Sequence, residues 1–238
     1  MPIKKSKFID PRDNHVYKTV IIGKQEWFAE NLCFATLDGF YSYDQADPDV
    51  RDDLDDLEVD GGYGYLYTIE AANMAAPEGW RLPSESDFIQ LARAVGVPKM
   101  QTIRFLSKFL KNSLFNCDKR WDDGAVCECI QSLSWNDACK DPFGFSAIYS
   151  GYGYLIESES DGYREQFLEF KGRGGYEEED PCVEARLWMS SECDGKPAYF
   201  FIEKDRVGFS NKLDRTNIDT FVNPVQCLCS VRLVRDVT

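Results

Sequence analysis

The amino-acid sequence predicts an α+β protein. Three observations support this class: a run of β-branched residues near the start, helical spacing of apolar residues in the first half, and short strand-like runs in the second half. Helices and strands that are segregated along the chain are typical of α+β domains. With 238 residues, of which 43% are hydrophobic, the chain can bury the core of one domain, because β-rich domains reach about 250 residues.

The first predicted element is a β-hairpin. A β-branched and apolar strand at 16–22 is followed by a turn that contains Gly23 and by a second short strand at 26–28. The acidic stretch 44–60 comes next. It has little periodic apolar content, so we expect a solvated loop there.

Two helices are expected after this loop. The segment 68–76 is rich in good helix formers and is closed by Pro77. The second helix begins after Ser84, whose side chain can cap it, with the carboxylate of Asp87 at the third helical position. A third helix is predicted at 99–114, where isoleucine and leucine recur on one stripe.

The second half is predicted to consist mainly of strands. Glycine, tyrosine and phenylalanine become frequent there, and short apolar runs alternate with polar segments. The strands are expected at 145–149, 186–190, 199–203, 207–210 and 229–235. The long polar stretches 171–180 and 211–224 are expected to be surface loops.

The charge of the chain excludes two classes of partner. Its 27 basic and 41 acidic residues give 27 − 41 = −14, and the isoelectric point is near 4.6. Nucleic acids and anionic membrane surfaces are bound chiefly by clustered lysine and arginine, so neither is an expected partner. No run approaches the roughly 18 apolar residues that a membrane-spanning helix needs, so no membrane insertion is expected.

Four ordered segments of the sequence resemble one known family. They are TVIIGKQEWFAENL at 19–32, YGYLYTIEAA at 63–72 with GWRLPS at 79–84, FGFSA at 143–147 and SVRLVRD at 230–236. Together they resemble the Fibrobacter succinogenes major paralogous domain over residues 8–236. Four such pieces in the right order, including a GWRLPS block that leads into a helix, are hard to obtain by chance.

The resemblance implies a C-type-lectin-like fold, which formylglycine-generating enzymes and receptor proteins diversified by retroelements share. In this fold we expect an opening hairpin, two to three helices, and an antiparallel, strand-rich second half whose last strand returns near the first. We expect residues 1–238 to form a single domain, with a family-atypical insertion around 97–140.

The chain departs from the family in its cysteines. Members place cysteines where this chain has Ala76 and Leu233, so a disulfide that the resemblance implies is absent here. A second implied pair is also absent, with Ser42 in place of one cysteine. Disulfides persist in oxidising compartments, and no apolar signal segment follows the first residues. The resemblance implies a bacterial protein. A chain that is complete as given is expected to be cytoplasmic, whereas a trimmed signal peptide would make it secreted or cell-surface.

Nine cysteines remain, and four of them show a symmetric spacing. The pattern Cys-x9-Cys-x-Cys-x9-Cys could supply four thiolates to a tetrahedral zinc ion. The four are Cys117, Cys127, Cys129 and Cys139. Usual structural zinc sites use Cys-x2-Cys spacing, so buried small side chains, or two local disulfides in an exported protein, stay open as alternatives.

Two further groups are candidates for catalysis. Cys227 and Cys229 lie two residues apart, on one face of a predicted strand. The pair is similar to the late cysteine pair of formylglycine-generating enzymes, which implies a thiol oxidase. The alternative is packing in the core, because a reactive thiol needs an accessible electropositive setting. His15 is the single histidine and is expected in an exposed turn, so histidine-dependent catalysis has no other residue to use.

One tripeptide is typical of a calcium site. Trp135-Asn136-Asp137 occurs in calcium-dependent C-type lectins, but its companion tripeptides are missing here. The acidic stretch 44–60 lacks the alternating order of a calcium loop. We therefore expect no cofactor, with structural zinc or calcium as the open alternatives.

The second half has a composition typical of recognition surfaces. Tyrosine and tryptophan occur there with asparagine, serine and glycine, and Tyr152, Tyr154 and Tyr163 are expected in loops. The candidate ligand-binding residues are Trp188, Tyr199, Arg206, Asn211 and Asp214. For the tryptophan and the tyrosine of this set, a place in the core is an equally good interpretation.

These observations predict a noncatalytic module that binds a protein or another ligand through the loops and strands of the second half. A protein or peptide is the expected partner, with carbohydrate as the alternative, because the calcium–sugar motif is missing. The competing functions are a scaffold domain without a small ligand and a thiol oxidase that uses Cys227 and Cys229. Fold alone does not decide among them.

Overall fold

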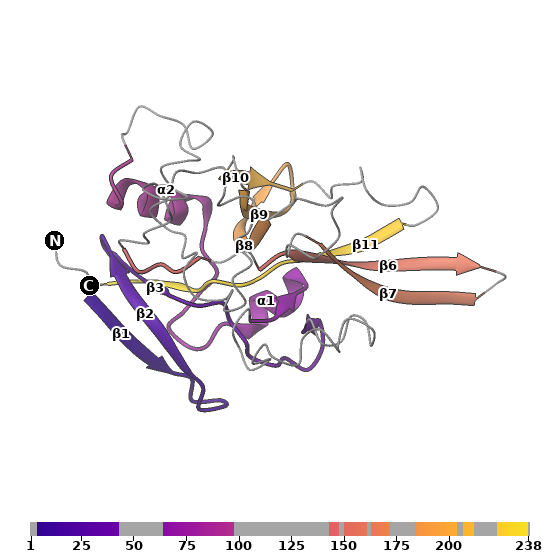
Figure 1. Cartoon of the computed structure of the whole chain (residues 1–238), viewed down its shortest axis with the longest axis horizontal. Helices are drawn as coiled ribbons and strands as arrows, with labels where there is room; N and C mark the ends of the chain where they lie inside the picture. The colour runs from indigo at the N-terminus through magenta and orange to yellow at the C-terminus, as the bar shows by residue number, and fades with distance from the viewer. Residues whose placement is uncertain are drawn as a thin grey trace, which may run out of the picture.

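The computed structural model describes residues 4–42, 64–97, 143–147, 150–160, 163–171, 184–203, 207–211 and 223–237 (Figure 1). The described part is rich in antiparallel strands and contains two helices, which agrees with the α+β prediction. The helices are α1 (Ile69–Ala75) and α2 (Glu85–Ala94). The strands are β1 (Lys4–Ile9), β2 (Val16–Ile22), β3 (Gln25–Phe28), β4 (Phe40–Tyr41), β5 (Leu66–Tyr67), β6 (Tyr152–Ser160), β7 (Tyr163–Lys171), β8 (Glu184–Cys193), β9 (Lys196–Glu203), β10 (Val207–Ser210), β11 (Asn223–Leu228) and β12 (Val234–Asp236).

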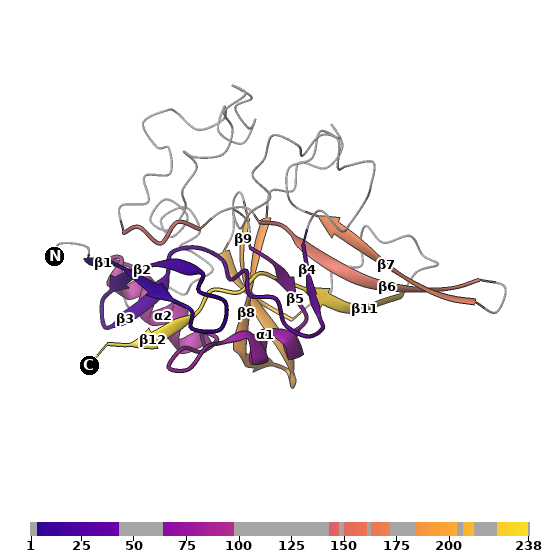
Figure 2. The same cartoon turned by 90° about the horizontal axis from the view of Figure 1, so that it is seen from below.

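The first sheet joins the two ends of the chain. Its order is β1-β2-β3-β12, with antiparallel neighbours throughout. The predicted hairpin is confirmed as β2 and β3. Gly23 in its turn has a φ of +65°, and a Cβ there would lie 2.9 Å from the Cβ of Ala94, so the position requires glycine. Because β12 pairs with β3, the last strand returns beside the opening hairpin as expected, and both ends of the chain lie on the same side of Figures 1 and 2.

Both helices predicted in the first half are confirmed together with their N-caps. Thr68 caps α1 by accepting a hydrogen bond from the backbone N–H of Ala71 at 3.2 Å. Ser84 and Asp87 form the predicted capping box at the start of α2. The third predicted helix, the acidic stretch 44–60 and most of the proposed insertion at 97–140 lie outside the described residues.

The second half contains two three-stranded antiparallel sheets, β10-β9-β8 and β11-β6-β7. The strands predicted at 186–190, 199–203 and 207–210 are confirmed within β8, β9 and β10. The tyrosines expected in loops lie instead in strands, at positions 152 and 154 of β6 and at the start of β7.

Two predicted strands of the second half differ from the structure. The segment 145–149 forms no strand in its described part, where Ala147 makes only an isolated bridge. The run 229–235 is divided, because the chain crosses there from one sheet to another. Cys229 forms a bridge with Tyr67 and Ser230 forms a parallel bridge with Leu187 before β12 begins.

The core has two aromatic clusters on opposite faces of β3. Successive strand residues point to opposite faces, so Trp27 packs at 5.4 Å from the ring of Phe88 in one cluster. Phe28 packs at 4.5 Å from the ring of Trp80 in the other. Within the described residues, no helix is long and apolar enough to cross a membrane.

A buried cation links the last connection to this core. The guanidinium of Arg232 donates to Asn31 Oδ1 at 2.6 Å and to the carbonyl oxygen of Ser146 at 2.7 Å. It also donates to the carbonyl oxygen of Phe145, whose ring lies 5.0 Å from the Arg232 Cζ. The family-like segments FGFSA and SVRLVRD therefore meet at one arginine, whose buried donors are satisfied by this contact.

Candidate functional site

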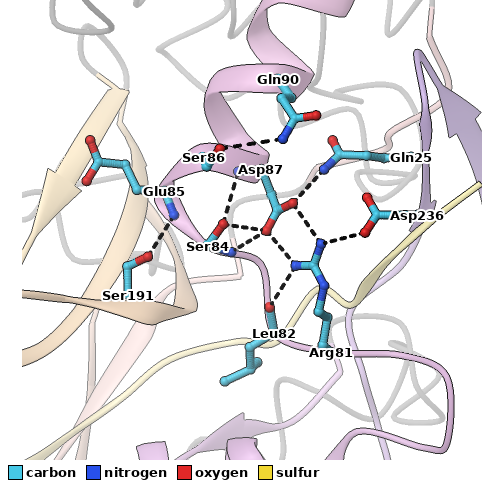
Figure 3. A network of polar contacts seen from close by, with 10 residues as sticks. All are labelled: Gln25, Arg81, Leu82, Ser84, Glu85, Ser86, Asp87, Gln90, Ser191 and Asp236. Atoms are coloured by element: carbon cyan, nitrogen blue, oxygen red, sulfur yellow. Dashed lines mark hydrogen bonds and ion pairs between the residues drawn. The ribbon is translucent and has the colours of Figure 1, made fainter.

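The GWRLPS segment builds a polar network at the start of α2 (Figure 3). Arg81 forms a two-armed ion pair with Asp87, with Nη1 at 2.5 Å from Oδ2 and Nη2 at 2.9 Å from Oδ1. The backbone N–H and the hydroxyl of Ser84 each donate to Oδ2 at 2.6 Å, and Gln25 Nε2 donates to Oδ1 at 2.6 Å. Donors therefore surround the buried carboxylate.

The same network ties α2 to three strands. Gln25 belongs to β3, and Asp236 of β12 lies 3.4 Å from Nη2 of Arg81. Ser191 of β8 accepts with its Oγ from the backbone N–H of Glu85 at 3.0 Å. The network therefore joins elements that are far apart in the sequence.

The electrostatics of this network are those of a structural site. Burial alone would raise the pKa of Asp87, but the hydrogen bonds from Arg81 and Ser84 outweigh it and hold the pKa below its ordinary value. A carboxylate kept ionised and fully used by its donors is unsuited to general acid–base catalysis near neutral pH. We therefore assign this network to folding.

A second buried cation lies where β6 and β8 meet. The guanidinium of Arg186 forms a two-armed pair with Glu184, at 2.6 and 3.2 Å, and donates to Tyr154 Oη at 3.1 Å. Its Cζ lies 3.3 Å from the ring centroid of Tyr152 and 4.8 Å from that of Tyr199. Aromatic rings and a carboxylate therefore hold the charge in place inside the protein.

Two of the predicted ligand-binding residues belong to this buried region. Trp188 is 4% exposed, and its Nε1 donates to the carbonyl oxygen of Tyr67 at 2.6 Å. Tyr199 is 5% exposed, and the two predicted rings meet edge to face, 6.3 Å apart. For these two residues the core interpretation matches the structure, and the expected exposure is wrong.

Of the other three predicted ligand-binding residues, the structure describes Asn211 alone. Asn211 is half-buried and donates from Nδ2 to the carbonyl oxygen of Cys193 at 2.5 Å, at the end of β8. Arg206 and Asp214 lie outside the described residues. Their role in binding stays a prediction.

The structure brings Cys227 and Cys229 into direct contact. Their Sγ atoms are 3.6 Å apart and both side chains are buried, beside Arg186. The hydrogen bond from the Cys229 thiol and the nearby guanidinium lower the pKa of Cys227, whereas burial raises the pKa of Cys229. Cys227 lies in β11 and Cys229 directly after Leu228, its last residue, and the burial of both side chains agrees with the core-packing alternative.

A contact that the sequence analysis missed joins His15 to Cys33. The His15 Nε2 lies 3.5 Å from the Cys33 Sγ, and the half-buried imidazole packs against the ring of Tyr17 at 4.4 Å. Burial, with nearby carboxylates, raises the pKa of the Cys33 thiol. A protonated thiol is a poor nucleophile, so this pair is not a catalytic dyad. No local motif signals the contact, because its two residues are 18 positions apart.

Metal ligation finds no geometric support in the described ranges. No group of three or more histidine, cysteine, aspartate or glutamate side chains that could hold a metal ion occurs among those residues. The zinc prediction concerns Cys117, Cys127, Cys129 and Cys139, and the calcium alternatives concern 44–60 and 135–137; all of these lie outside the described residues. Both stay predictions.

The hairpin of β6 and β7 projects away from the rest of the molecule in both views (Figures 1 and 2). The two strands pair over nine residue pairs, from Tyr152–Lys171 to Ser160–Tyr163. On the other side, β11 pairs with β6 only as far as Glu157. The sheet order β11-β6-β7 leaves the outer edge of β7 without a neighbouring strand in the part of the chain that the structure describes.

Comparison with known proteins identifies the family. The family model of the Fibrobacter succinogenes major domain matches residues 20–235. The searches of curated proteins and of solved structures gave no significant match. The matched range begins within β2, contains β3, both helices and the GWRLPS segment, and continues through the described second half into β12. The chain therefore belongs to the Fibrobacter succinogenes major domain family.

Proposed function

We propose that the chain is a noncatalytic protein-binding module with a C-type-lectin-like fold, in which the outer edge of β7 receives an extended segment of the partner. The observation that carries this proposal is the long hairpin whose outer strand has no neighbour in the described part. An edge strand presents a row of unpaired N–H and C=O groups, and an added strand can pair with them.

The arrangement of the elements supports the lectin-like fold. Along the chain, the opening hairpin comes first, the two described helices follow, and the strand-rich half comes after them. The last strand, β12, then pairs with β3 of the opening hairpin. This is the order that the family resemblance implied. The hairpin of β6 and β7 extends beyond the other described elements of the fold (Figure 1).

The charge of the hairpin indicates a basic partner. Between residues 152 and 171 the acidic residues outnumber the basic ones. The acidic ones are Glu157, Glu159, Asp161, Glu165 and Glu169, against Arg164 and Lys171. Since the whole chain also carries a formal charge of −14, an extended segment rich in lysine or arginine fits this edge best.

An edge strand of the first sheet shows the contrast. β1 is also an edge strand, but its sequence carries Lys4, Lys5 and Lys7, and these residues are exposed. Lysines on an edge strand oppose the pairing of further strands, and they repel a basic segment. β7 is therefore the better acceptor of the two edges.

The other predicted contacts take two roles in this proposal. Arg206, Asn211 and Asp214 stay proposed contacts of the partner outside the hairpin. Trp188 and Tyr199 are buried at its root, so we expect them to act by supporting β6 and β8. Substitution of either by alanine would then lower the stability of the fold before it lowers the affinity for the partner.

The test uses proline substitutions in β7 and a defined probe. Successive residues of an antiparallel strand point their N–H groups alternately toward the neighbouring strand and away from it. Of Glu165→Pro and Gln166→Pro, one therefore removes an outward N–H and the other an inward N–H. The probe is a synthetic peptide that alternates lysine and valine, with an alternating glutamate–valine peptide as its control. Binding is measured by fluorescence anisotropy on the full chain.

The expected result is capture of the lysine peptide alone, with loss of capture in the outward-facing proline variant while near-ultraviolet circular dichroism is unchanged. Ser6→Pro in β1 is the matched edge control and should leave capture intact. Equal capture in all three variants would contradict the proposal. So would a concentration-dependent dimer that disappears in the same β7 variant, because a second copy would then occupy the edge.

A further inference from the structure

The two thiols at the root of the hairpin are placed so that they can form a bond. Their Sγ atoms are 3.6 Å apart, against about 2.05 Å in a disulfide, so they need to approach by roughly 1.5 Å. Residues two apart in a strand have Cα atoms about 6.6 Å apart, which lies near the upper end of the range of roughly 4.4–6.8 Å that disulfides span. The bond can therefore form with a small local adjustment, and it stays easy to reduce.

The surroundings make the two sulfurs unequal. Cys227 is 8% exposed, whereas Cys229 is fully buried, so an oxidant in solvent reaches Cys227 first. The guanidinium of Arg186 and the Cys229 thiol lower the pKa of Cys227, and burial raises that of Cys229. The first cysteine is therefore suited to attack as a thiolate. The second keeps its proton until it attacks, and it is the 3.6 Å contact between the two sulfurs that places it to react with an oxidised Cys227.

We propose that Cys227 and Cys229 form a reversible dithiol/disulfide pair that is oxidised by hydroperoxides. In the first step the Cys227 thiolate attacks one oxygen of the hydroperoxide, the O–O bond breaks, and with one proton the products are a sulfenic acid and an alcohol, or water from hydrogen peroxide. In the second step the Cys229 sulfur attacks the sulfenic sulfur. The S–S bond forms, and the hydroxyl leaves with the Cys229 proton as water. The sulfurs lose two electrons in total, and the hydroperoxide gains them.

The site of this pair connects it to two parts of the fold. Cys227 lies opposite Tyr154 of β6 in the register of β11, at the root of the hairpin. Cys229 exchanges backbone hydrogen bonds with Tyr67 of β5, at 2.9 and 3.1 Å. The two cysteines therefore lie between β5 and the hairpin of β6 and β7. Their oxidation does not require a bound partner.

The test is peptide mapping of the oxidised full chain. Trypsin cleaves after Arg215 and Arg232, so one peptide, 216–232, contains both cysteines and none of the other seven. The folded protein is treated with hydrogen peroxide, blocked with iodoacetamide and digested without reductant. We expect this peptide to carry no iodoacetamide label and to be about 2 Da lighter than the same peptide with two free thiols, because a disulfide has two hydrogens fewer. Dithiothreitol before blocking should restore two alkylation sites.

Two variants separate the roles of the two sulfurs. In Cys229→Ser, dimedone should trap a sulfenic acid on Cys227, because the resolving thiol is gone. In Cys227→Ser, the remaining cysteine should stay a thiol over the same time. Cys33→Ser is the matched control and should leave the 2 Da change intact, and circular dichroism verifies the fold of each variant. A peptide that stays dithiol while other cysteines oxidise, or a pair that joins other cysteines instead, would overturn the proposal.

Discussion

The GWRLPS network and the β6–β7 hairpin use polar groups in opposite ways. In the network, the carboxylate of Asp87 receives hydrogen bonds from three residues, and its partners tie one helix to three strands. In the hairpin, the outer strand pairs on one side only within the described residues. The GWRLPS segment, which is one of the four family-like segments, therefore stabilises the fold. The proposed binding edge lies in β7, outside all four of these segments.

The largest expected effect concerns the buried arginine at the root of the hairpin. Arg186→Met removes the buried cation of the ion pair with Glu184, which costs about 3–5 kcal/mol of unfolding free energy. Urea denaturation measures this loss. The double variant that adds Glu184→Gln should recover most of it, because both charges of the pair are then removed.

Arg235→Met provides the control for that prediction. Arg235 also pairs with a glutamate, Glu26, at 2.6 Å, but its side chain is 41% exposed. The arginine side of this pair is open to solvent although Glu26 is buried, so the pair is expected to contribute less than the fully buried one, about 1 kcal/mol. A similar cost in Arg186→Met and Arg235→Met would show that burial does not separate the two sites.

The next effect concerns the centre of the network. Asp87→Asn removes a charged acceptor from several hydrogen bonds and is expected to cost about 1.5–3 kcal/mol at pH 7. The folded-state pKa of Asp87 lies below the ordinary value of 3.8, so its contribution is complete above that value and is lost as the pH falls through the folded pKa. Urea denaturation at several pH values should show the difference between wild type and variant shrinking below about pH 3.8. A difference that does not change with pH would contradict the assignment.

The helix cap gives a smaller effect. Ser84→Ala removes the side-chain acceptor of the Asp87 N–H and one donor to its carboxylate, at a cost of about 1 kcal/mol. Ser86→Ala is the matched control on the same helical turn. The Ser86 side chain is exposed, so this substitution should lower the unfolding free energy by only a few tenths of that amount. Thermal unfolding of both variants compares them directly, and equal shifts would argue against the capping role.

The smallest effect on stability is expected in the hairpin. The variant Glu165→Lys changes the charge of β7 near the tip of the hairpin, opposite Ser158, and should alter the unfolding free energy by less than about 0.5 kcal/mol. Capture of the lysine–valine peptide should fall several-fold at low salt, and the difference should narrow at high salt because screening weakens charge pairing. Unchanged capture at low salt would remove the charge argument for a basic partner.

The sequence predicted the elements that local signals define. The hairpin turn at Gly23 and the N-caps Thr68 and Ser84 depend on residues within a few positions of each other, and all three are confirmed. The return of the last strand came from the family resemblance rather than from local pattern, and it too is confirmed.

Elements that depend on distant partners were missed. β1 carries three lysines in six residues and no apolar alternation, so only its pairing with β2 makes it a strand. The run 229–235 has strand-like composition, but bridges to β5 and β8 divide it. The rings of Trp188 and Tyr199 have a composition typical of binding surfaces, and long-range packing buries them. Which aromatic residues face solvent is decided by tertiary contacts that composition does not encode.

Strand addition at β7 is tested most directly by hydrogen exchange of the β7 amides, read by mass spectrometry with and without the lysine–valine peptide. We expect about half of these amides, those pointing away from β6, to exchange fast in the free chain and to slow down when the peptide is bound. The amides of β1 should exchange equally in both samples. Unchanged exchange in β7 with bound peptide, or protection confined to β1 or to the helices, would contradict binding by strand addition at this edge.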